Sequence, residues 1–300
     1  MANHQRSWTL PPSQKPVARL FIFHGTHEHC GKPCYAELAA AANARGIEAF
    51  AIDFHGHGLN TNGARGDFGP LDDAINEAVA LVVKERGELP FAIFGHSLGS
   101  MVSFLAAHKL ATDPSLPTPA CVVLSGFAMD SVSPPFGVTA LVPVLRAVPS
   151  VVRFVCAILS SVDPTGPACP LPPATELMRC PERAALTASD KLQYQGWIMN
   201  RTGVALLDAR KRCNELLSEW GRAFPFLLIH GGADKLCPRS ACDSLIAASP
   251  QMDKQLKVYE GYYHETLNDT KERRERVKGE VVQWLEERLQ KGGAPIRSRL

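Results

Sequence analysis

A serine between two glycines stands in the stretch FAIFGHSLGS, where Gly95, Ser97 and Gly99 form a G-x-S-x-G motif. An apolar run predicts a strand over 90–97, and a helical pattern follows over 97–113. The motif requires this strand–turn–helix context, because a tight turn with small flanking residues projects the serine hydroxyl outward. A plain glycine turn would look similar over five residues, but the context favours Ser97 as a nucleophile.

Two later residues could supply the base and the acid that a serine hydroxyl needs near neutral pH. Asp234 follows a predicted strand over 225–232, and His264 follows one over 254–261. Their order after Ser97, acid and then histidine, is the order expected with this motif. We therefore predict a catalytic triad of Ser97, Asp234 and His264. Other candidates precede the nucleophile or fall inside a predicted element, namely His4, Asp53, His108 and His230.

Short apolar runs alternate with helical patterns along most of the chain. This alternation predicts an α/β fold with a mostly parallel, doubly wound sheet, whose site gathers at the carboxyl ends of the strands. A proline- and cysteine-rich block interrupts it, so we expect a core of 1–127 and 206–300 and an inserted cap of 128–205. The predicted strands are 17–25, 47–54, 90–97, 120–127, 225–232 and 254–261, and the predicted helices are 35–46, 71–87, 97–113, 238–249 and 280–291.

The loop after the first predicted strand, HGTHEHCGKPCY over 24–35, is rich in residue types that bind metals. A zinc site requires a second cluster of ligands at regular spacing, and this loop has none, so we expect no metal. Acyl transfer instead requires two backbone N–H groups that meet an oxyanion. One comes from the residue after the nucleophile and the other from an early loop. Leu98 and Thr26 are the predicted donors.

These motifs together resemble the monoacylglycerol lipases, a serine aminopeptidase S33-like group of the α/β-hydrolase superfamily. The resemblance is carried by HGTHEH, DFHGHGLNTNG, GHSLG, GGADKLC and LKVYEGYYH, and it spans about residues 17–290. It implies an α/β-hydrolase fold in which the insertion forms a helical cap over an acyl-chain tunnel. It also implies that Glu28 helps to bind the glycerol end of the substrate. Lys32 stands near a family arginine and is a second candidate for substrate binding.

The segment 138–159 is the longest apolar stretch, but it contains Arg146, Arg153 and two prolines. A membrane span needs about 20 apolar residues with few charges, so we expect an amphipathic or interfacial helix. Two interpretations remain open for its apolar side chains. They pack on the core, or they form a rim that docks transiently on membranes and admits an acyl chain.

Composition excludes several other classes of protein. The 300 residues carry a net charge of +2 and contain 45% hydrophobic and 21% charged residues, which is typical of a globular protein without a nucleic-acid partner. The N-terminal stretch has no apolar core of signal-peptide length. Nine cysteines without a C-x-x-C pair then indicate reduced thiols. We expect a cytoplasmic protein with peripheral membrane contact; no oligomeric state is predicted.

The resemblance implies a serine hydrolase that cleaves monoacylglycerols to fatty acid and glycerol, with no cofactor. A small lipid is therefore the expected partner, either a monoacylglycerol or a lysolipid. Two alternative functions remain open. One is a lysophospholipase or general carboxylesterase with the same triad, and the other is a non-catalytic interaction protein that retains the fold.

Overall fold

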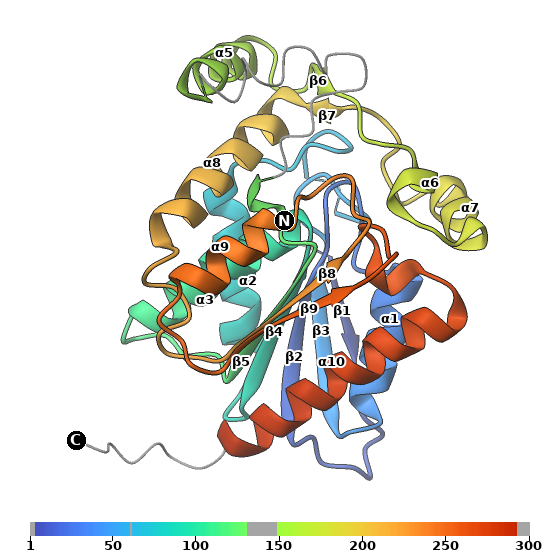
Figure 1. The fold of residues 1–300 in the computed structure, drawn as a ribbon, viewed down its shortest axis with the longest axis vertical. Coiled ribbons are helices and arrows are strands. Elements are labelled where there is room, and N and C mark those ends of the chain that lie inside the picture. Colours follow the sequence, from blue (N-terminus) through green and yellow to red (C-terminus); the bar gives the residue numbers. More distant parts are fainter. Residues whose placement is uncertain (1–3, 61, 131–148, 293–300) are drawn as a thin grey trace.

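The fold was obtained as a computed structural model, which describes residues 4–60, 62–130 and 149–292. Seven strands form one sheet in the order β1-β3-β2-β4-β5-β8-β9, with the cap beyond one end of the strands (Figure 1). All neighbouring pairs are parallel except β1 and β3. The strands are β1 Gln5–Trp8, β2 Ala18–Phe23, β3 Ile47–Ile52, β4 Phe91–His96, β5 Cys121–Ser125, β8 Phe226–Gly231 and β9 Lys254–Tyr259.

The central strands are apolar along most of their length, because helices cover both faces of a parallel sheet. Every residue of β4, β5 and β8 is buried. Since these strands are parallel, their carboxyl ends meet at one edge, and the loops after β2, β4, β8 and β9 converge there. The predicted mostly parallel, doubly wound sheet is confirmed.

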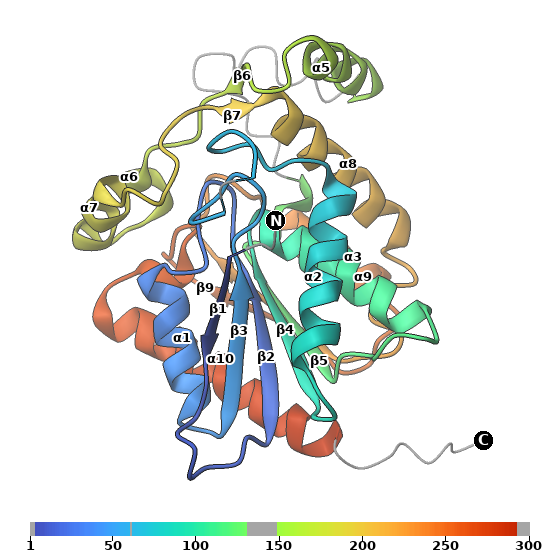
Figure 2. The same ribbon diagram turned by 180° about the vertical axis from the view of Figure 1, so that it is seen from behind.

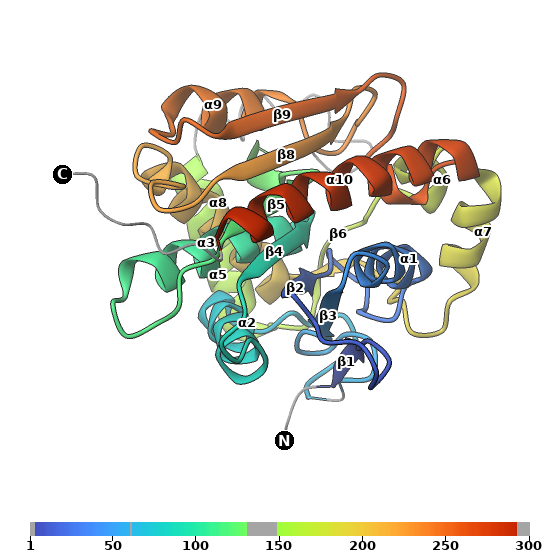
Figure 3. The ribbon, with the colours of Figure 1, turned by 90° about the horizontal axis from the view of Figure 1, so that it is seen from below.

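Helices α1 and α10 cover one face of the sheet, and α2, α3 and α9 lie on the other (Figure 2). Seen from below, α1 and α2 stand on opposite sides of β2 and β3 (Figure 3). Two apolar clusters follow this division, one with residues of α2, α3, α8 and α9, the other with residues of α1 and α10. The bounds are α1 Pro33–Asn43, α2 Leu71–Glu85, α3 Leu98–Thr112, α9 Ser240–Ala248 and α10 Lys271–Gly292.

The cap combines two longer helices, α5 and α8, with several short elements above the carboxyl edge of the sheet (Figure 1). The expected boundary between residues 205 and 206 falls inside α8, which runs from the cap down against α3. The cap also contains two very short paired strands, where none was clear from sequence. Its elements are η1 Ala128–Asp130, α5 Pro149–Val162, β6 Pro167–Cys169, α6 Ala174–Leu177, α7 Pro181–Ser189, β7 Ile198–Met199 and α8 Asn200–Leu216.

Part of the apolar segment 138–159 can be compared with its prediction. Helix α5 confirms the expected helix from residue 149 onward, whereas 138–148 lie outside the described residues, as does the tail after 292. Arg153 of α5 pairs with Asp208 of α8, and the two helices pack together. Over the part of the chain that the structure describes, no helix combines the length and the apolar character needed to cross a membrane.

Candidate active site

The turn between β4 and α3 places Ser97 at a sharp bend. Its backbone has φ 52° and ψ −121°, a strained conformation for a residue with a side chain. A Cβ on Gly95 would lie 2.2 Å from the Ser103 hydroxyl oxygen, and one on Gly99 would lie 2.3 Å from the carbonyl oxygen of Phe23. Both positions therefore require glycine. The strand–turn–helix context expected around Ser97 is confirmed.

His264 and Asp234 meet at the same edge of the sheet. The Nδ1 atom of His264 lies 2.8 Å from the Oδ2 of Asp234. The other carboxylate oxygen of Asp234 accepts N–H bonds from Leu236 and Cys237, at 2.8 and 3.0 Å. A carboxylate held in this way keeps the Nδ1–H tautomer of the imidazole, so Nε2 is free to act as a base. Burial lowers the pKa of His264, but the charge and hydrogen bond of Asp234, together with Cys237, raise that pKa above 6.5.

The end of β5 connects the histidine to the serine. The Ser97 N–H donates to the Ser125 carbonyl at 2.9 Å. A Cβ on the next residue, Gly126, would come within 2.8 Å of the His264 ring. The rings of His96 and His264 also lie 4.9 Å apart between centroids. Within the described residues, the buried Nε2 of His264 has no hydrogen-bond partner. The structure thus brings Ser97, Asp234 and His264 to one place.

The loop after β2, residues 24–29, lies against the nucleophile. A Cβ on Gly25 would be 3.1 Å from the Ser97 Cβ, and half-buried Thr26 follows in the chain. Leu98 is the first residue of α3, so its N–H is one of the helix-terminal donors without an intrahelical acceptor. Of the two predicted oxyanion donors, Leu98 therefore directly follows Ser97, and Thr26 follows the residue that contacts it. We name residues 24–29 the oxyanion loop.

Glu28 and Lys32, the expected substrate-binding residues, are both buried and bonded to the protein. One carboxylate oxygen of Glu28 accepts the Gly25 N–H at 2.8 Å and the Tyr35 hydroxyl, and the other accepts from the Lys32 ammonium. The pKa of Tyr35 is raised, chiefly by burial and also by the charge of Glu28. In this arrangement the Glu28 carboxylate fixes the backbone of the oxyanion loop at Gly25.

Two further buried residues, Glu265 and His96, belong to the same polar cluster as Lys32 and were not predicted as site residues. Glu265 lies 3.9 Å from the Lys32 ammonium and 3.2 Å from the Nε2 of His96. Burial opposes the charge of Lys32, but Glu265 and Glu28 hold its pKa above the ordinary value. Burial likewise disfavours the Glu265 charge, but Lys32 and His96 lower its pKa well below 4.5. The only sequence signal was indirect, since a buried lysine requires a carboxylate partner.

Three groups of side chains in the described residues bring metal-ligating atoms within 4.8 Å of one another. Asp234, Cys237 and His264 belong to the triad region. Glu28, His96 and Glu265 surround the Lys32 ammonium, which already supplies the positive charge. In the third group, His4, Cys30 and Asp53, both carboxylate oxygens of Asp53 accept backbone N–H bonds. The side chains of the first two groups therefore already have partners within the candidate active site. In the third group, Asp53 is already bonded to the backbone of two loops.

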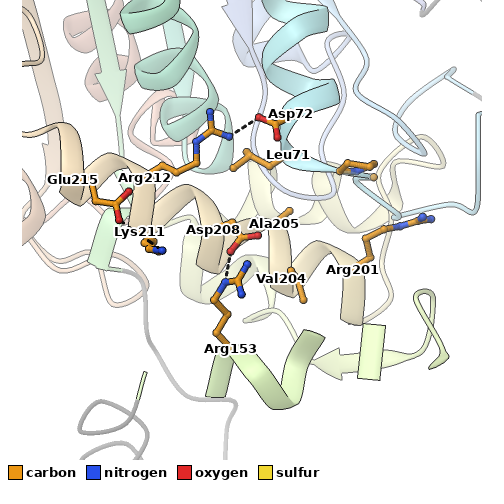
Figure 4. A pocket seen from close by; sticks show the side chains of 12 residues that line it. Leu71, Asp72, Arg153, Arg201, Val204, Ala205, Asp208, Lys211, Arg212 and Glu215 are labelled. Carbon is orange, nitrogen blue, oxygen red and sulfur yellow. Dashed lines mark hydrogen bonds and ion pairs between the residues drawn. The ribbon is translucent and has the colours of Figure 1, made fainter. Parts of the chain in front are cut away.

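An open pocket of about 450 Å³ lies on the outer side of α8, away from these residues (Figure 4). Arg153 reaches Asp208 at 2.5 Å, and Arg212 reaches Asp72 at 2.5 Å. Its lining includes no member of the triad or the oxyanion loop. The charged groups at the pocket neutralise one another in pairs, so it lacks the convergent polar groups of a catalytic site.

Comparisons with known proteins agree with this arrangement. Residues 14–271 match the family described as serine aminopeptidase, S33. The chain is 31% identical to the monoglyceride lipase of Rattus norvegicus over 94% of this chain and 87% of that protein. It is 27% identical to the monoacylglycerol lipase of Mycolicibacterium smegmatis over 93% of this chain and 90% of that protein.

A solved structure extends the agreement to the fold. The monoacylglycerol lipase of Paleococcus ferrophilus superposes with a TM-score of 0.78 at 22% identity, over 96% of this chain and 100% of that one. The family match covers most of the chain and includes Ser97 and His264. The chain therefore belongs to the monoacylglycerol lipase family of the α/β-hydrolase superfamily and is a carboxylic ester hydrolase.

Proposed function

We propose that the protein hydrolyses monoacylglycerols to fatty acid and glycerol through Ser97, His264 and Asp234. The observation that carries the proposal is the strained Ser97 turn beside the hydrogen-bonded His264–Asp234 pair. The substrate class is supported by the monoglyceride lipases among the relatives. The reaction uses protein side chains and water, and it needs no cofactor.

In the first half-reaction, the Ser97 hydroxyl attacks the ester carbonyl while His264 accepts its proton. The N–H groups of Thr26 and Leu98 receive the charge that develops on the carbonyl oxygen. His264 then returns the proton to the departing glycerol oxygen, and an acyl-enzyme remains. Asp234 keeps the imidazole in the required tautomer and stabilises its charged form. Water repeats the sequence, which releases fatty acid and restores Ser97.

Glu28 and Lys32 enter the proposal with a role that follows from their burial. Their side chains are only 4% and 2% exposed, and both are engaged with protein groups. We therefore assign them to fixing Gly25, and through it the neighbouring Thr26, rather than to direct contact with the glycerol end. This position makes them supports of the oxyanion hole.

Helix α5 supports transient contact with a lipid surface. Phe154 and Val162 are 64% and 81% exposed, and the helix shows further exposed apolar residues at Val155, Ile158 and Leu159. Monoacylglycerols with long chains reside in membranes or aggregates, so an enzyme that acts on them benefits from an apolar docking face. We propose α5 as that face.

The direct test measures release of fatty acid from 1- and 2-monoacylglycerol, from lysophosphatidylcholine and from a short soluble ester. Wild type and Ser97→Ala are compared, with circular dichroism to verify folding. We expect fast release from monoacylglycerol that disappears in Ser97→Ala. Preference for lysophosphatidylcholine would favour a lysophospholipase, and release from the short ester alone would indicate a general carboxylesterase. No release from any ester would support a non-catalytic role.

A further inference from the structure

The oxyanion loop contains a residue in an unusual backbone conformation. His27 follows the proposed donor Thr26 and has φ 64°; among the described residues only Ser97 shares a positive φ without being glycine. A side chain disfavours this left-handed region, so such a conformation persists only where the surroundings hold it. The direction of the Thr26–His27 backbone therefore depends on what contacts His27.

Contacts from two sides hold His27 in place. Its N–H donates to the Nε2 of His57 at 3.1 Å, from the neighbouring core loop. Its carbonyl accepts the N–H of Tyr194 at 3.1 Å, from the cap. The Tyr194 ring also packs edge-on against the His27 ring, with centroids 4.7 Å apart. One of the two backbone hydrogen bonds that hold His27 thus comes from the cap.

A second cap contact lies two residues further along the loop. The Nε2 of His29 lies 2.7 Å from the Oδ2 of Asp190, while its Nδ1 accepts the Gly31 N–H at 3.1 Å. The Nε2 atom must therefore carry the proton that Asp190 accepts. Burial raises the pKa of Asp190, but the hydrogen bonds from His29 and from the Leu192 N–H, together with the charge of Lys32, hold that pKa below 3.8. The carboxylate is thus charged at neutral pH.

A core side chain also binds the main chain of this part of the cap. Arg65 donates to the carbonyl oxygens of Lys191 and Leu192, at 3.2 and 2.7 Å. We define residues 190–194 as the cap clasp. It bonds to His27 and to His29, the two residues that flank Glu28, and Arg65 anchors its middle.

We infer that the cap clasp sets the geometry of the oxyanion hole, and that Asp190 is a positioning residue for ester hydrolysis. The inference rests on the proposed function, because it assigns the Thr26 N–H as a donor. Loss of a whole oxyanion donor typically lowers kcat by about 10²–10³-fold. A donor that is displaced but still present should cost less, so we expect Asp190→Ala to lower kcat by roughly 10–100-fold.

Three variants test the assignment. Asp190→Ala removes the acceptor for His29, whereas Asp190→Asn keeps an oxygen that can accept the same N–H. Ser189→Ala is the matched control, since Ser189 is exposed and, among the described residues, its hydroxyl donates to the Leu186 carbonyl within α7. Each variant is titrated with a fluorophosphonate, so that kcat is expressed per reactive serine. A short soluble ester serves as substrate, because it needs no acyl-chain tunnel.

The readouts separate positioning from stability. We expect Asp190→Ala to lose kcat with KM changed less than about threefold, and to bind a trifluoromethyl ketone inhibitor more weakly in proportion. Asp190→Asn should recover most of the loss, and Ser189→Ala should match wild type. If Asp190→Ala does not fold, the comparison of Asp190→Asn with His29→Ala carries the test, with the larger kcat loss expected in His29→Ala.

A double variant adds an independent check. His29→Ala and Asp190→Ala remove the same hydrogen bond, so the combined variant should be no slower than the slower single one. Additive losses would overturn the inference, as would a kcat per active serine equal to that of Ser189→Ala. If the wild type hydrolyses no ester, the proposed function and the inference fail together. If hydrolysis is Ser97-dependent but insensitive to Asp190, only the inference fails.

Discussion

The region around the triad and helix α5 differ in the side chains that they expose to water. Around the triad, charged groups such as Lys32 and Glu265 are buried, and each is paired with another protein group. On α5, apolar side chains such as Phe154 and Val162 remain exposed. Buried charges are costly unless paired, and exposed apolar stripes mark surfaces for partners. The charged groups of the first region are therefore paired within the chain, whereas the second region leaves open the apolar face that we propose for contact with a lipid surface.

The largest expected effect lies in the first region and should not depend on the physical state of the substrate. Asp234→Asn keeps the shape of the side chain but stabilises the wrong tautomer of His264. We expect kcat to fall by about 10⁴-fold on every ester, by analogy with the same change in a serine protease triad. The measurement compares a short soluble ester with dispersed monoacylglycerol. A loss confined to the dispersed lipid would contradict the assignment of Asp234.

The pH profile gives this prediction a second readout. His264 must be neutral to accept the Ser97 proton, and Asp234 raises its pKa above 6.5. Activity should therefore fall as the pH drops through that raised pKa, which puts the midpoint of the acid limb above pH 6.5. In Asp234→Asn the charge that raises the pKa is gone, so the midpoint should move to lower pH. An unmoved midpoint would assign the titration to another group.

The next effect concerns stability. Lys32→Met leaves the carboxylates of Glu28 and Glu265 buried without their cation, and breaking a buried pair in this way costs about 3–5 kcal/mol. We expect a loss of that size in the free energy of unfolding, measured by urea denaturation. Lys257→Met is the control, because its pair with Glu280 is about one third exposed and should contribute less than about 1 kcal/mol. Equal losses in both variants would contradict the buried network.

A smaller effect should appear only at a lipid surface. Ile158→Glu places a charge on the exposed face of α5, where Ile158 is 48% exposed. Burying an aliphatic side chain is worth about 1.5–3 kcal/mol, and half of that corresponds to roughly three- to tenfold in binding. We expect activity on monoacylglycerol vesicles to fall by about this factor, with the short ester unaffected. Val83→Glu, at 49% exposure on α2, should change neither activity.

The smallest effect belongs to the ion pair that links α5 to α8. Arg153 and Asp208 meet at 2.5 Å, but their side chains are 46% and 28% exposed. Exposed pairs contribute about 0–1 kcal/mol. Asp208→Ala should therefore change the melting temperature by only a few degrees and leave hydrolysis of the short ester intact. A large loss would mean that α5 is held more firmly than its exposed face indicates.

The sequence predicted the parts of the site that local pattern determines. The Ser97 turn, the strands before Asp234 and His264, and their order are visible as apolar runs that end in glycine or polar residues. Strand β1 was missed, because QRSW is mostly exposed and becomes a strand only through pairing with β3. A pattern in one segment carries no information about a partner that folds elsewhere.

The same reason explains what was missed near the triad. Glu265 and Asp190 gain their roles from Lys32 and His29, which are far away in the chain. Lys32 was expected near the substrate, because it stands near a family arginine. In the structure Lys32 is instead buried, and its ammonium is paired with the carboxylates of Glu28 and Glu265, which offset the cost of burying the charge. Long-range pairing of this kind depends on the packing of the whole fold.

The distribution of the triad over the sheet also decides when activity can begin during synthesis. Ser97 follows β4 in the first third of the chain, whereas His264 follows β9, an edge strand near the end. A nascent chain would thus carry the proposed nucleophile without the proposed base while residues 98–264 are added. Because β9 pairs only with β8 in the described sheet, the enzyme should become active late, when this last strand docks.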